Sequence, residues 1–339
     1  MRVLVTGGAG YIGSHTCVEL LLSGCEVLIV DNLSNANNNV LKRIERLAGK
    51  KVDFCKIDLR DTKSLISIFN HFRPETVIHF AGLKSVSESV LDPLKYYDTN
   101  VTGAISLLKA MDKVECKQIV FSSSATVYGE PQYLPYDENH PTEPINPYGI
   151  SKLFVENLIR DWSSAGVQRY SIALRYFNPV GAHNSGMIGE DPNGTPNNLM
   201  PFVSQVAIGK RAFVNIFGND YNTADGTGVR DYIHVSDLAN AHLAAVKHLG
   251  SLKNFEFLNL GSGKGVTVLE LIRSFEKVTG INIPKKFLNR REGDLPSFWA
   301  SPRQAEKKIN FSVKYNIDQM CHDTWKWQKN NPEGYNTKS

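Results

Sequence analysis

The stretch VLVTGGAGYIG at residues 3–13 decides the fold. A short apolar run precedes Gly7, Gly10 and Gly13, and a run with helical spacing follows them. Such glycines permit a tight turn and close backbone approach to a pyrophosphate, which the next helix N-terminus would face. Asp31 follows a second apolar run, where a carboxylate accepts hydrogen bonds from ribose hydroxyls and repels a 2′-phosphate. The stretch predicts a dinucleotide site that prefers NAD to NADP, and the alternative is a turn whose glycines only let helix pack on strand.

Working outward from this stretch, short apolar runs alternate with longer amphipathic runs, which is typical of parallel βα units. We expect strands at residues 2–6, 26–30, 52–57, 76–80, 118–122 and 171–175, and helices at 12–23, 101–111 and 151–162. Gly24 stands where a helix-ending glycine takes a positive φ. These runs favour an open, doubly wound parallel sheet of the Rossmann type over a closed barrel of eight strands.

The pattern changes in the second half of the chain. Glycine, asparagine and proline crowd residues 179–201, which indicates loops, and helical spacing returns at 235–249 and 268–279. We therefore expect an α/β protein with an NAD-binding Rossmann domain at 1–177. A smaller mixed α/β domain at 178–339 would bind substrate, and some of its segments would return to the first domain.

Composition excludes several classes of protein. The chain has 339 residues, enough for about two domains, and its 38 Lys+Arg against 34 Asp+Glu give a net charge of +4 without long basic runs. Nucleic acid is not an expected partner. No apolar run reaches the ~18 residues of a membrane span, and the five cysteines never fall in a CxxC spacing. We expect a cytoplasmic protein without a metal site, in which His79 and His234 are packing residues.

Tyr148 and Lys152 form a candidate acid–base pair. They lie four residues apart at the start of the helical run at 151–162, and therefore on one face. Alone, such a pair would more often be solvated surface. Here a serine run at 122–124 ends the expected fifth strand, and ligands of open α/β sheets bind beyond the carboxyl ends of strands. The ammonium would favour the phenolate form of the tyrosine.

With these motifs in place, the chain resembles the extended short-chain dehydrogenase/reductase family, and within it the members that epimerise nucleotide sugars. The resemblance rests on VTGGAGYIGSH at 5–15, HFAGLK at 79–84, SSSATVYG at 122–129, RYFNPVGA at 175–182, NNLMP at 197–201, GVRDYIHV at 228–235 and RREGDLP at 290–296. The first and third segments are shared by many relatives, and those from residue 175 onward point to the epimerising members.

The resemblance implies reversible 4-epimerisation of UDP-glucose and UDP-galactose. Tyr148, as phenolate, would take the proton of the sugar 4-hydroxyl while the C4 hydride passes to tightly held NAD. The 4-keto sugar would present its other face and take the hydride back. Lys152 would lower the pKa of the phenol and hold the nicotinamide ribose, and Ser124 would relay the proton.

The resemblance also implies two sets of contacts. The cofactor set is Gly7, Gly10, Tyr11, Ile12, Gly13, Asp31, Asn32, Asp58, Leu59, Phe80, Ala81, Gly82, Lys84, Asn100, Ser122, Tyr148, Lys152 and Phe177. The substrate set is Lys84, Ser124, Tyr148, Asn178, Asn198, Leu199, Phe217, Arg230, Arg291, Asp294 and Phe298.

The two separated arginines of the substrate set, Arg230 and Arg291, suit a diphosphate, and Phe217 offers a flat face to a base. Two other candidates also have simpler interpretations. Lys84 could be an ordinary surface lysine. Asn100 could be a helix N-cap that needs no cofactor to explain it.

Phe298 bears on the choice of sugar. Relatives that accept N-acetylated sugars carry a small residue there, and relatives selective for glucose and galactose usually carry tyrosine. Phenylalanine keeps the ring and loses the hydroxyl, so we expect Phe298 to crowd out an acetamido group.

Two other functions compete with this prediction. A nucleotide-sugar 4,6-dehydratase shares the cofactor loop and the Tyr/Lys pair, but such relatives place Asp-Glu where this chain has Ala125-Thr126. A non-catalytic NAD-binding regulator would keep only the fold.

The family resemblance further implies a homodimer that packs through the helical runs at 101–111 and 151–162.

Overall fold

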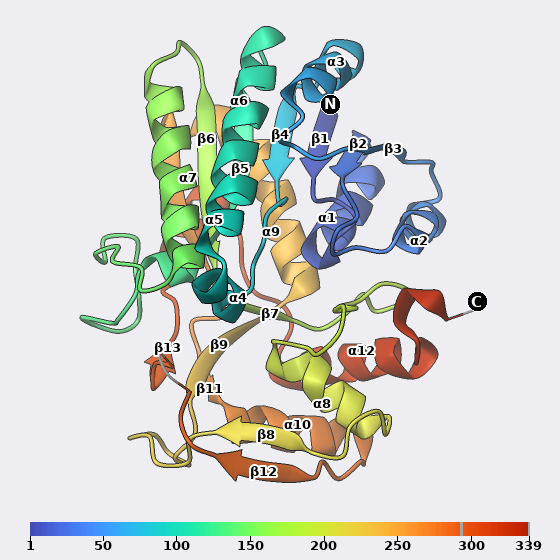
Figure 1. Ribbon diagram of the computed structural model, residues 1–339, viewed down its shortest axis with the longest axis vertical. Helices are drawn as coiled ribbons and strands as arrows, with labels where there is room; N and C mark the ends of the chain where they lie inside the picture. Colours follow the sequence, from blue (N-terminus) through green and yellow to red (C-terminus); the bar gives the residue numbers. More distant parts are fainter. Residues whose placement is uncertain (292–293, 338–339) are drawn as a thin grey trace.

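The computed structural model describes residues 1–291 and 294–337. Its upper lobe is built on a seven-stranded, wholly parallel sheet in the order β3-β2-β1-β4-β5-β6-β10 (Figure 1). The strands are β1 (Arg2–Thr6), β2 (Glu26–Asp31), β3 (Asp53–Lys56), β4 (Thr76–His79), β5 (Gln118–Ser124), β6 (Tyr170–Tyr176) and β10 (Phe255–Leu260). This confirms the predicted doubly wound sheet.

Helices cover both faces of the sheet. One face carries α1 (Tyr11–Leu22), α2 (Asn39–Ala48) and α9 (Val235–His248). The other carries α3 (Thr62–Phe72), α6 (Gly103–Lys113) and α7 (Pro147–Ser164). Before α6 the chain forms α4 (Val86–Leu91), α5 (Pro93–Tyr96) and a π-helical turn at Tyr97–Thr102. Because both faces are covered, the strands are continuous apolar runs rather than alternating ones.

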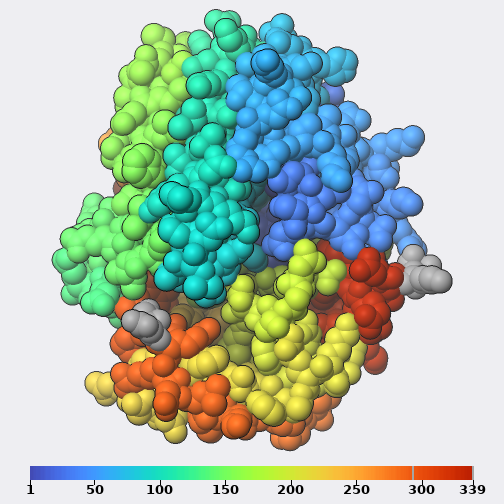
Figure 2. Space-filling view, viewed as in Figure 1, coloured from blue at the N-terminus to red at the C-terminus, as the bar shows by residue number. Residues whose placement is uncertain are grey.

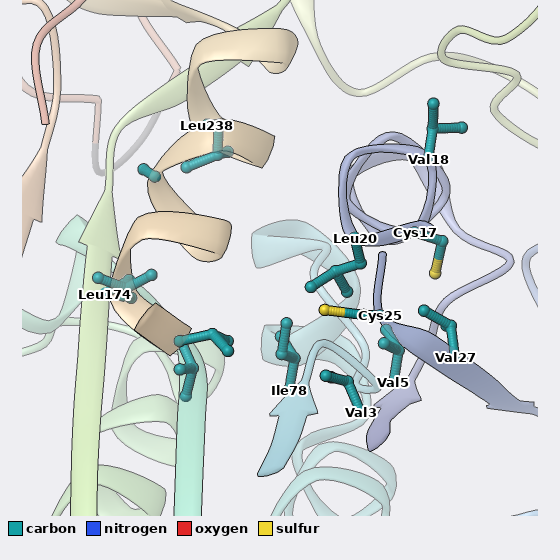
Figure 3. Close-up of a cluster of buried hydrophobic side chains, with 14 of the residues drawn as sticks. Val3, Val5, Cys17, Val18, Leu20, Cys25, Val27, Ile78, Leu174 and Leu238 are labelled. Atoms are coloured by element: carbon teal, nitrogen blue, oxygen red, sulfur yellow. The ribbon is translucent and has the colours of Figure 1, made fainter. Parts of the chain in front are cut away.

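The core beneath α1 and α9 shows how the sheet is held. Figure 3 shows Val3 and Val5 of β1 beside Ile78 of β4, with Leu20 of α1 above them and Leu238 of α9 nearby. All five side chains are fully buried. Burial of each aliphatic side chain stabilises the fold by roughly 1.5–3 kcal/mol, so this layer fixes α1 and its N-terminal loop against the sheet.

Helix α7 begins earlier than the sequence pattern predicts. Asn146 caps it by accepting a hydrogen bond from Gly149 N at 2.9 Å, and Pro147 occupies the first turn. The predicted start at residue 151 is therefore wrong by four residues. Tyr148 lies inside the helix, one turn before Lys152.

The sheet has one strand more than the six apolar runs predict. Strand β10 pairs with β6 along its whole length and forms the edge of the sheet. Two polar residues, Glu256 and Asn259, interrupt its apolar pattern. The strand tolerates them because Glu256 binds Lys308 Nζ at 2.6 Å and Asn259 is hydrogen-bonded to Glu138 and Tyr136. Such specific partners cannot be inferred from periodicity.

The lower lobe mixes helices and short strands around its own core (Figure 1). Its helices are α8 (Leu199–Ala207), α10 (Val268–Thr279) and α12 (Ile317–Asn330), and α11 (Arg303–Ile309) packs on α9 and β10. Its strands are β7 (Asn178–Val180), β8 (Val214–Phe217), β9 (Val229–His234), β11 (Gly265–Thr267), β12 (Lys285–Leu288) and β13 (Ser297–Phe298). Short 3₁₀ turns occur at Ala125–Val127, Leu249–Ser251 and Gly334–Asn336.

A search for membrane spans among residues 1–291 and 294–337 finds no helix with both the length and the apolar character to cross a bilayer.

The glycine turn generates a prediction about stability. A Cβ at Gly13 would lie 2.3 Å from Gly7 O and 2.8 Å from Gly8 Cα, both rigid backbone atoms. We expect Gly13→Ala to lower the free energy of unfolding by about 3 kcal/mol or more, the upper end of what overpacking costs. Urea denaturation followed by circular dichroism measures this.

The matched control is Gly250→Ala, because nothing lies within 4 Å of a Cβ at that position. It should unfold with the unchanged protein. Equal midpoints for Gly13→Ala and Gly250→Ala would contradict the steric argument.

Candidate active site

The strand order reverses between β1 and β4, and the site lies at the carboxyl ends of these strands. Chain connections run outward from β1 in one direction and from β4 in the other, which leaves a crevice between the loops that follow them. The loop after β1 is tied to β2, since Gly7 N donates to Val30 O at 2.8 Å. The loop after β4 is tied to β1, since Ala81 N donates to Thr6 O at 3.2 Å.

The glycines of the first loop have different reasons for lacking a side chain. A Cβ at Gly7, whose φ is +70°, would lie 2.6 Å from Ala81 N, and Gly13 is equally crowded. Packing alone explains these two. Gly10 is different, because among the described residues the only close neighbour of a Cβ there would be Gly7 O at 3.2 Å. Gly10 precedes α1, which has no side-chain cap, so the loop leaves uncapped N–H groups and little bulk where an anion would approach.

Asp31 is fixed by the same loop. Its carboxylate accepts hydrogen bonds from Ala9 N at 3.1 Å and Leu33 N at 2.9 Å. Burial raises its pKa, and these two N–H groups oppose the rise. The carboxylate retains lone pairs that can accept from ribose hydroxyls.

A second acidic group follows β3. Asp58 accepts from Asn32 Nδ2 at 3.1 Å, and hydrogen bonds from Arg60 hold the pKa of Asp58 well below its usual range. Leu59, next to it, is buried. The structure therefore places Asn32, Asp58 and Leu59 at one end of the crevice.

The structure brings Ser124, Tyr148 and Lys152 together at the end of β5 and the start of α7. Lys152 Nζ donates to Ser122 O at 2.8 Å and lies 5.9 Å from the centre of the Tyr148 ring. Ser124 Oγ accepts from Thr126 Oγ1 at 2.9 Å. All three catalytic candidates are buried.

Burial shifts both titratable groups of this cluster toward their neutral forms. It raises the pKa of Tyr148, and the Ser124 hydroxyl partly offsets the rise. Burial also lowers the pKa of Lys152 to about 8, against the attraction of Glu156. Desolvation of the phenol therefore works against the phenolate form that the sequence predicts for Tyr148.

Asn100 is not a helix N-cap. It lies within the π-helical turn before α6, and its side chain accepts from Leu83 N at 2.8 Å. Its amide donates to Leu83 O at 3.2 Å and to Ser151 Oγ at 3.0 Å. It therefore fastens the loop after β4, which holds Phe80, Ala81 and Gly82, to helix α7.

Lys84 is paired rather than freely solvated. Its Nζ lies 3.2 Å from Glu190 Oε1, and Asn198 Nδ2 donates to the same oxygen at 3.0 Å. Sequence reasoning missed Glu190, an isolated acid in a loop with no periodic signal. This carboxylate joins a candidate cofactor contact of the upper lobe to a candidate substrate contact of the lower lobe.

A second group in the lower lobe gathers Phe217, Arg230, Arg291 and Asp294. Arg291 Nε donates to Asp294 Oδ2 at 3.0 Å, and its guanidinium carbon lies 4.4 Å from the centre of the Phe217 ring. Arg230 Nη2 donates to Asp294 Oδ1 at 3.4 Å. Two cations thus share one carboxylate beside an aromatic face.

The remaining candidates link these groups. Phe177 lies 4.9 Å from Phe298, and Tyr136 lies 5.0 Å from Phe298, between ring centres. Strand β13 places Phe298 directly beside Arg230 of β9. Two further candidates, Asn178 and Leu199, begin β7 and α8.

Three other side chains lie in or near the crevice. Tyr11 OH donates to Gly181 O at 2.6 Å, Ser122 Oγ hydrogen-bonds with Tyr176 OH, and Ile12 packs against the core under α1. His79 and His234 are buried, as predicted, with His234 paired to Asp323. In the described part of the chain, no three His, Cys, Asp or Glu side chains converge as metal ligands would.

The fold and the site together define a class of protein. The doubly wound sheet has a glycine turn where its strand order reverses, and Ser124, Tyr148 and Lys152 meet at β5 and α7. These are the features of a short-chain dehydrogenase/reductase. A family model described as GDP-mannose 4,6 dehydratase matches residues 4–324. UDP-glucose 4-epimerase of Bacillus subtilis is 51% identical over 335 residues, with 99% of each chain covered.

Solved structures agree with these sequence matches. UDP-glucose 4-epimerase of Bifidobacterium longum, in complex with NAD+ and UDP, superposes with a TM-score of 0.95 at 47% identity, covering 98% of this chain and 100% of that one. The enzyme of Stenotrophomonas maltophila, with NAD and formylated UDP-arabinopyranose, gives 0.95 at 48% identity, covering 97% and 98%. The chain belongs to the UDP-glucose 4-epimerase family within the wider family that the model describes.

Proposed function

We propose that the protein is an NAD-dependent isomerase that interconverts UDP-glucose and UDP-galactose at C4 of the sugar. The observation that carries this proposal is the convergence of Ser124, Tyr148 and Lys152 beside a glycine turn with an open backbone at Gly10. Membership of the epimerase family supports the same reaction.

The residues along the crevice fit NAD. The uncapped N-terminus of α1 suits the pyrophosphate, Asp31 a ribose, and Asn32, Asp58 and Leu59 the adenosine end. NAD held by these residues would supply the hydride acceptor for C4 of the sugar. Asn100 keeps Phe80, Ala81 and Gly82 beside α7, and Phe177 directly follows Tyr176, the partner of Ser124 in the sheet register.

The side chains of the cluster move and stabilise a proton. Tyr148, as phenolate, accepts the proton of the 4-hydroxyl, and Ser124 hydrogen-bonds the reacting oxygen. Because burial raises the pKa of Tyr148, the phenolate needs positive charge nearby. The Lys152 ammonium supplies it below the lysine pKa of about 8, so deprotonation of Lys152 removes this support.

The lower lobe suits the nucleotide part of the substrate. Arg230 and Arg291 would exchange Asp294 for diphosphate oxygens, and Phe217 would stack on the base. The remaining candidates for substrate contacts are Lys84, Asn178, Asn198 and Leu199.

We also propose a division into two domains and a cellular location. Residues 1–177 would form the NAD-binding domain and residues 178–339 the substrate-binding domain, with β10, α9 and α11 returning to the first. All five cysteines are free, which suits a reducing compartment, so we propose a cytoplasmic location.

The apolar surface of α4, α5 and α7 supports a homodimer. Val90, Leu91, Leu94 and Phe154 are 59% to 86% exposed, an unusual exposure for such large apolar side chains. Helices α4, α5 and α6 all contact α7, and Figure 2 shows α4 to α6 as a continuous teal surface beside the green of α7. A second copy that packs on this surface would cover these side chains.

The reaction predicts the behaviour of Tyr148→Phe. The unchanged protein, incubated with UDP-galactose, should produce UDP-glucose up to a stable mixture, followed by proton NMR. Tyr148→Phe lacks the proton acceptor, so we expect turnover to fall by 10³-fold or more while NAD binding is retained.

Other outcomes of this experiment distinguish the alternatives. Unchanged turnover by Tyr148→Phe would mean that the tyrosine is misassigned. A 4-keto-6-deoxy product, which absorbs in the ultraviolet, would indicate a dehydratase. If the unchanged protein did not convert UDP-galactose even with NAD added, a non-catalytic regulator would be favoured.

The packing of Phe298 predicts sugar selectivity. Its ring is held by Phe177 and Tyr136, so it cannot easily swing away from a bulky 2-substituent. We expect kcat/KM for UDP-N-acetylgalactosamine to be at least 100-fold below that for UDP-galactose. In Phe298→Cys the difference between these two kcat/KM values should be smaller. Ready turnover of the acetylated sugar by the unchanged protein would refute this role.

The apolar helical surface predicts the oligomeric state. Sedimentation velocity at micromolar concentration should give the mass of two chains. Leu94→Glu combined with Phe154→Glu should give the mass of one, because two charges would be buried at the interface. The control Val167→Glu changes an equally exposed valine beyond α7 and should remain dimeric. A monomeric unchanged protein would rule out this interface.

A further inference from the structure

A buried acid lies one turn beyond the catalytic pair on α7. Tyr148, Lys152 and Glu156 are spaced by four residues and therefore share one face of the helix. Glu156 has no exposed surface. The reaction derived above gives this carboxylate no role, although a buried charge is costly unless it is paired.

Glu156 joins three elements behind the site. Its Oε1 accepts from Ser123 Oγ at 2.5 Å and from Arg175 Nε at 2.9 Å. Its Oε2 accepts from Arg175 Nη2 at 2.6 Å. Ser123 of β5 and Arg175 of β6 are direct neighbours in the sheet register. The carboxylate therefore fixes α7 against the strand that carries Ser122 and Ser124.

Arg175 is itself tightly held. Its guanidinium carbon lies 4.1 Å from the centre of the Phe257 ring and 4.9 Å from that of Tyr128. Nη1 has no hydrogen-bond partner within the described residues, so Glu156 provides the polar contacts that orient this cation. A buried ion pair adds little to stability compared with apolar residues of similar size. The charges of the Glu156–Arg175 pair therefore indicate a role beyond packing.

The charge of Glu156 acts on Lys152. Burial drives Lys152 toward its neutral form, and Glu156 is the group whose attraction opposes this. The other titratable groups near Lys152 do not stabilise its charge. His79 of β4 is neutral, with its pKa lowered to about 3, and burial raises the pKa of Tyr148 of α7 and of Tyr176 of β6, which disfavours a negative charge on either ring.

Arg175 limits the pull of the carboxylate. Because Arg175 and Ser123 take up the oxygens of Glu156, Lys152 Nζ donates to Ser122 O instead and stays beside Tyr148. Glu138 also attracts Arg175. Glu156 thus attracts the ammonium without capturing it.

We propose that Glu156, held by Arg175 and Ser123, is a positioning residue that keeps Lys152 charged and directed at Ser122 O beside Tyr148. This inference deepens the proposed epimerisation and rests on it for its activity readout. The carboxylate touches neither substrate nor cofactor and acts only through Lys152.

The test is Glu156→Gln, which keeps the shape of the side chain and removes the charge. Arg175 then adds uncompensated positive charge, so the ammonium is disfavoured and the pKa of Lys152 falls below about 8. We expect the alkaline limb of the kcat–pH profile to move at least one pH unit lower. At pH 8 kcat should fall about fivefold for a shift of one unit, while KM for UDP-galactose changes less than threefold.

Two comparison variants separate charge from packing. Glu156→Asp retains the charge and should restore the alkaline limb. Glu256→Gln breaks a different ion pair, the partly buried one with Lys308 at the edge of the sheet, and should leave the kcat–pH profile unchanged. If Glu156→Gln does not fold, the neutral pair Glu156→Leu with Arg175→Met is measured in its place. A smaller shift in the same direction is expected, because the positive charge of Arg175 is removed together with the attraction of Glu156, and no shift in this variant would contradict the proposal.

A second readout does not depend on turnover. The ¹⁵Nζ shift of Lys152, assigned by comparison with Lys152→Met, should titrate near pH 8 in the unchanged protein and at least one unit lower in Glu156→Gln. A coincident titration in the two proteins would overturn the proposal, whatever the thermal stability of the variant. Absence of epimerisation together with the expected ¹⁵N shift would refute the proposed reaction and leave the positioning role intact.

Discussion

The close approach of the Gly7 backbone to Ala81 is the constraint on which the site depends. It occurs where β1 and β4 diverge, and a Cβ at Gly7 would collide with Ala81 N. Because Gly7 turns there with a positive φ, α1 can start directly above the sheet with its N–H groups facing the crevice. The core under α1, with Val3, Val5 and Leu20, holds this arrangement rigid.

The two lobes contribute different chemistry to the crevice. The upper lobe supplies a proton-transfer cluster whose groups are desolvated and whose charges are therefore strongly coupled. The lower lobe supplies cations that are already paired, since Arg230 and Arg291 share Asp294. In the proposed function, a diphosphate would replace this existing partner rather than meet two unpaired charges, so recognition would exchange one anion for another. Glu190 joins the lobes through Lys84 and Asn198.

The sequence predicts the sheet well because its strands are buried on both faces and read as unbroken apolar runs. It predicts the glycine turn and the Tyr148–Lys152 spacing because local geometry alone sets them. It fails where tertiary partners decide: the polar residues of β10 hide a strand, and Asn100 serves Leu83 and Ser151 rather than a helix end. The pKa of Tyr148 depends on burial, which no spacing reveals, and Glu190 and Glu156 acquire meaning only from their neighbours.

The edges of the sheet bear on how copies of the chain can associate. Strand β3 is only four residues long and carries Asp53 and Lys56 at its ends, while β10 carries the Glu256–Lys308 pair. Short, charged edges are poor templates for the addition of a further strand. Growth into fibrils through backbone pairing is therefore disfavoured, which leaves helical surfaces such as the apolar surface of α4, α5 and α7 for contact between copies.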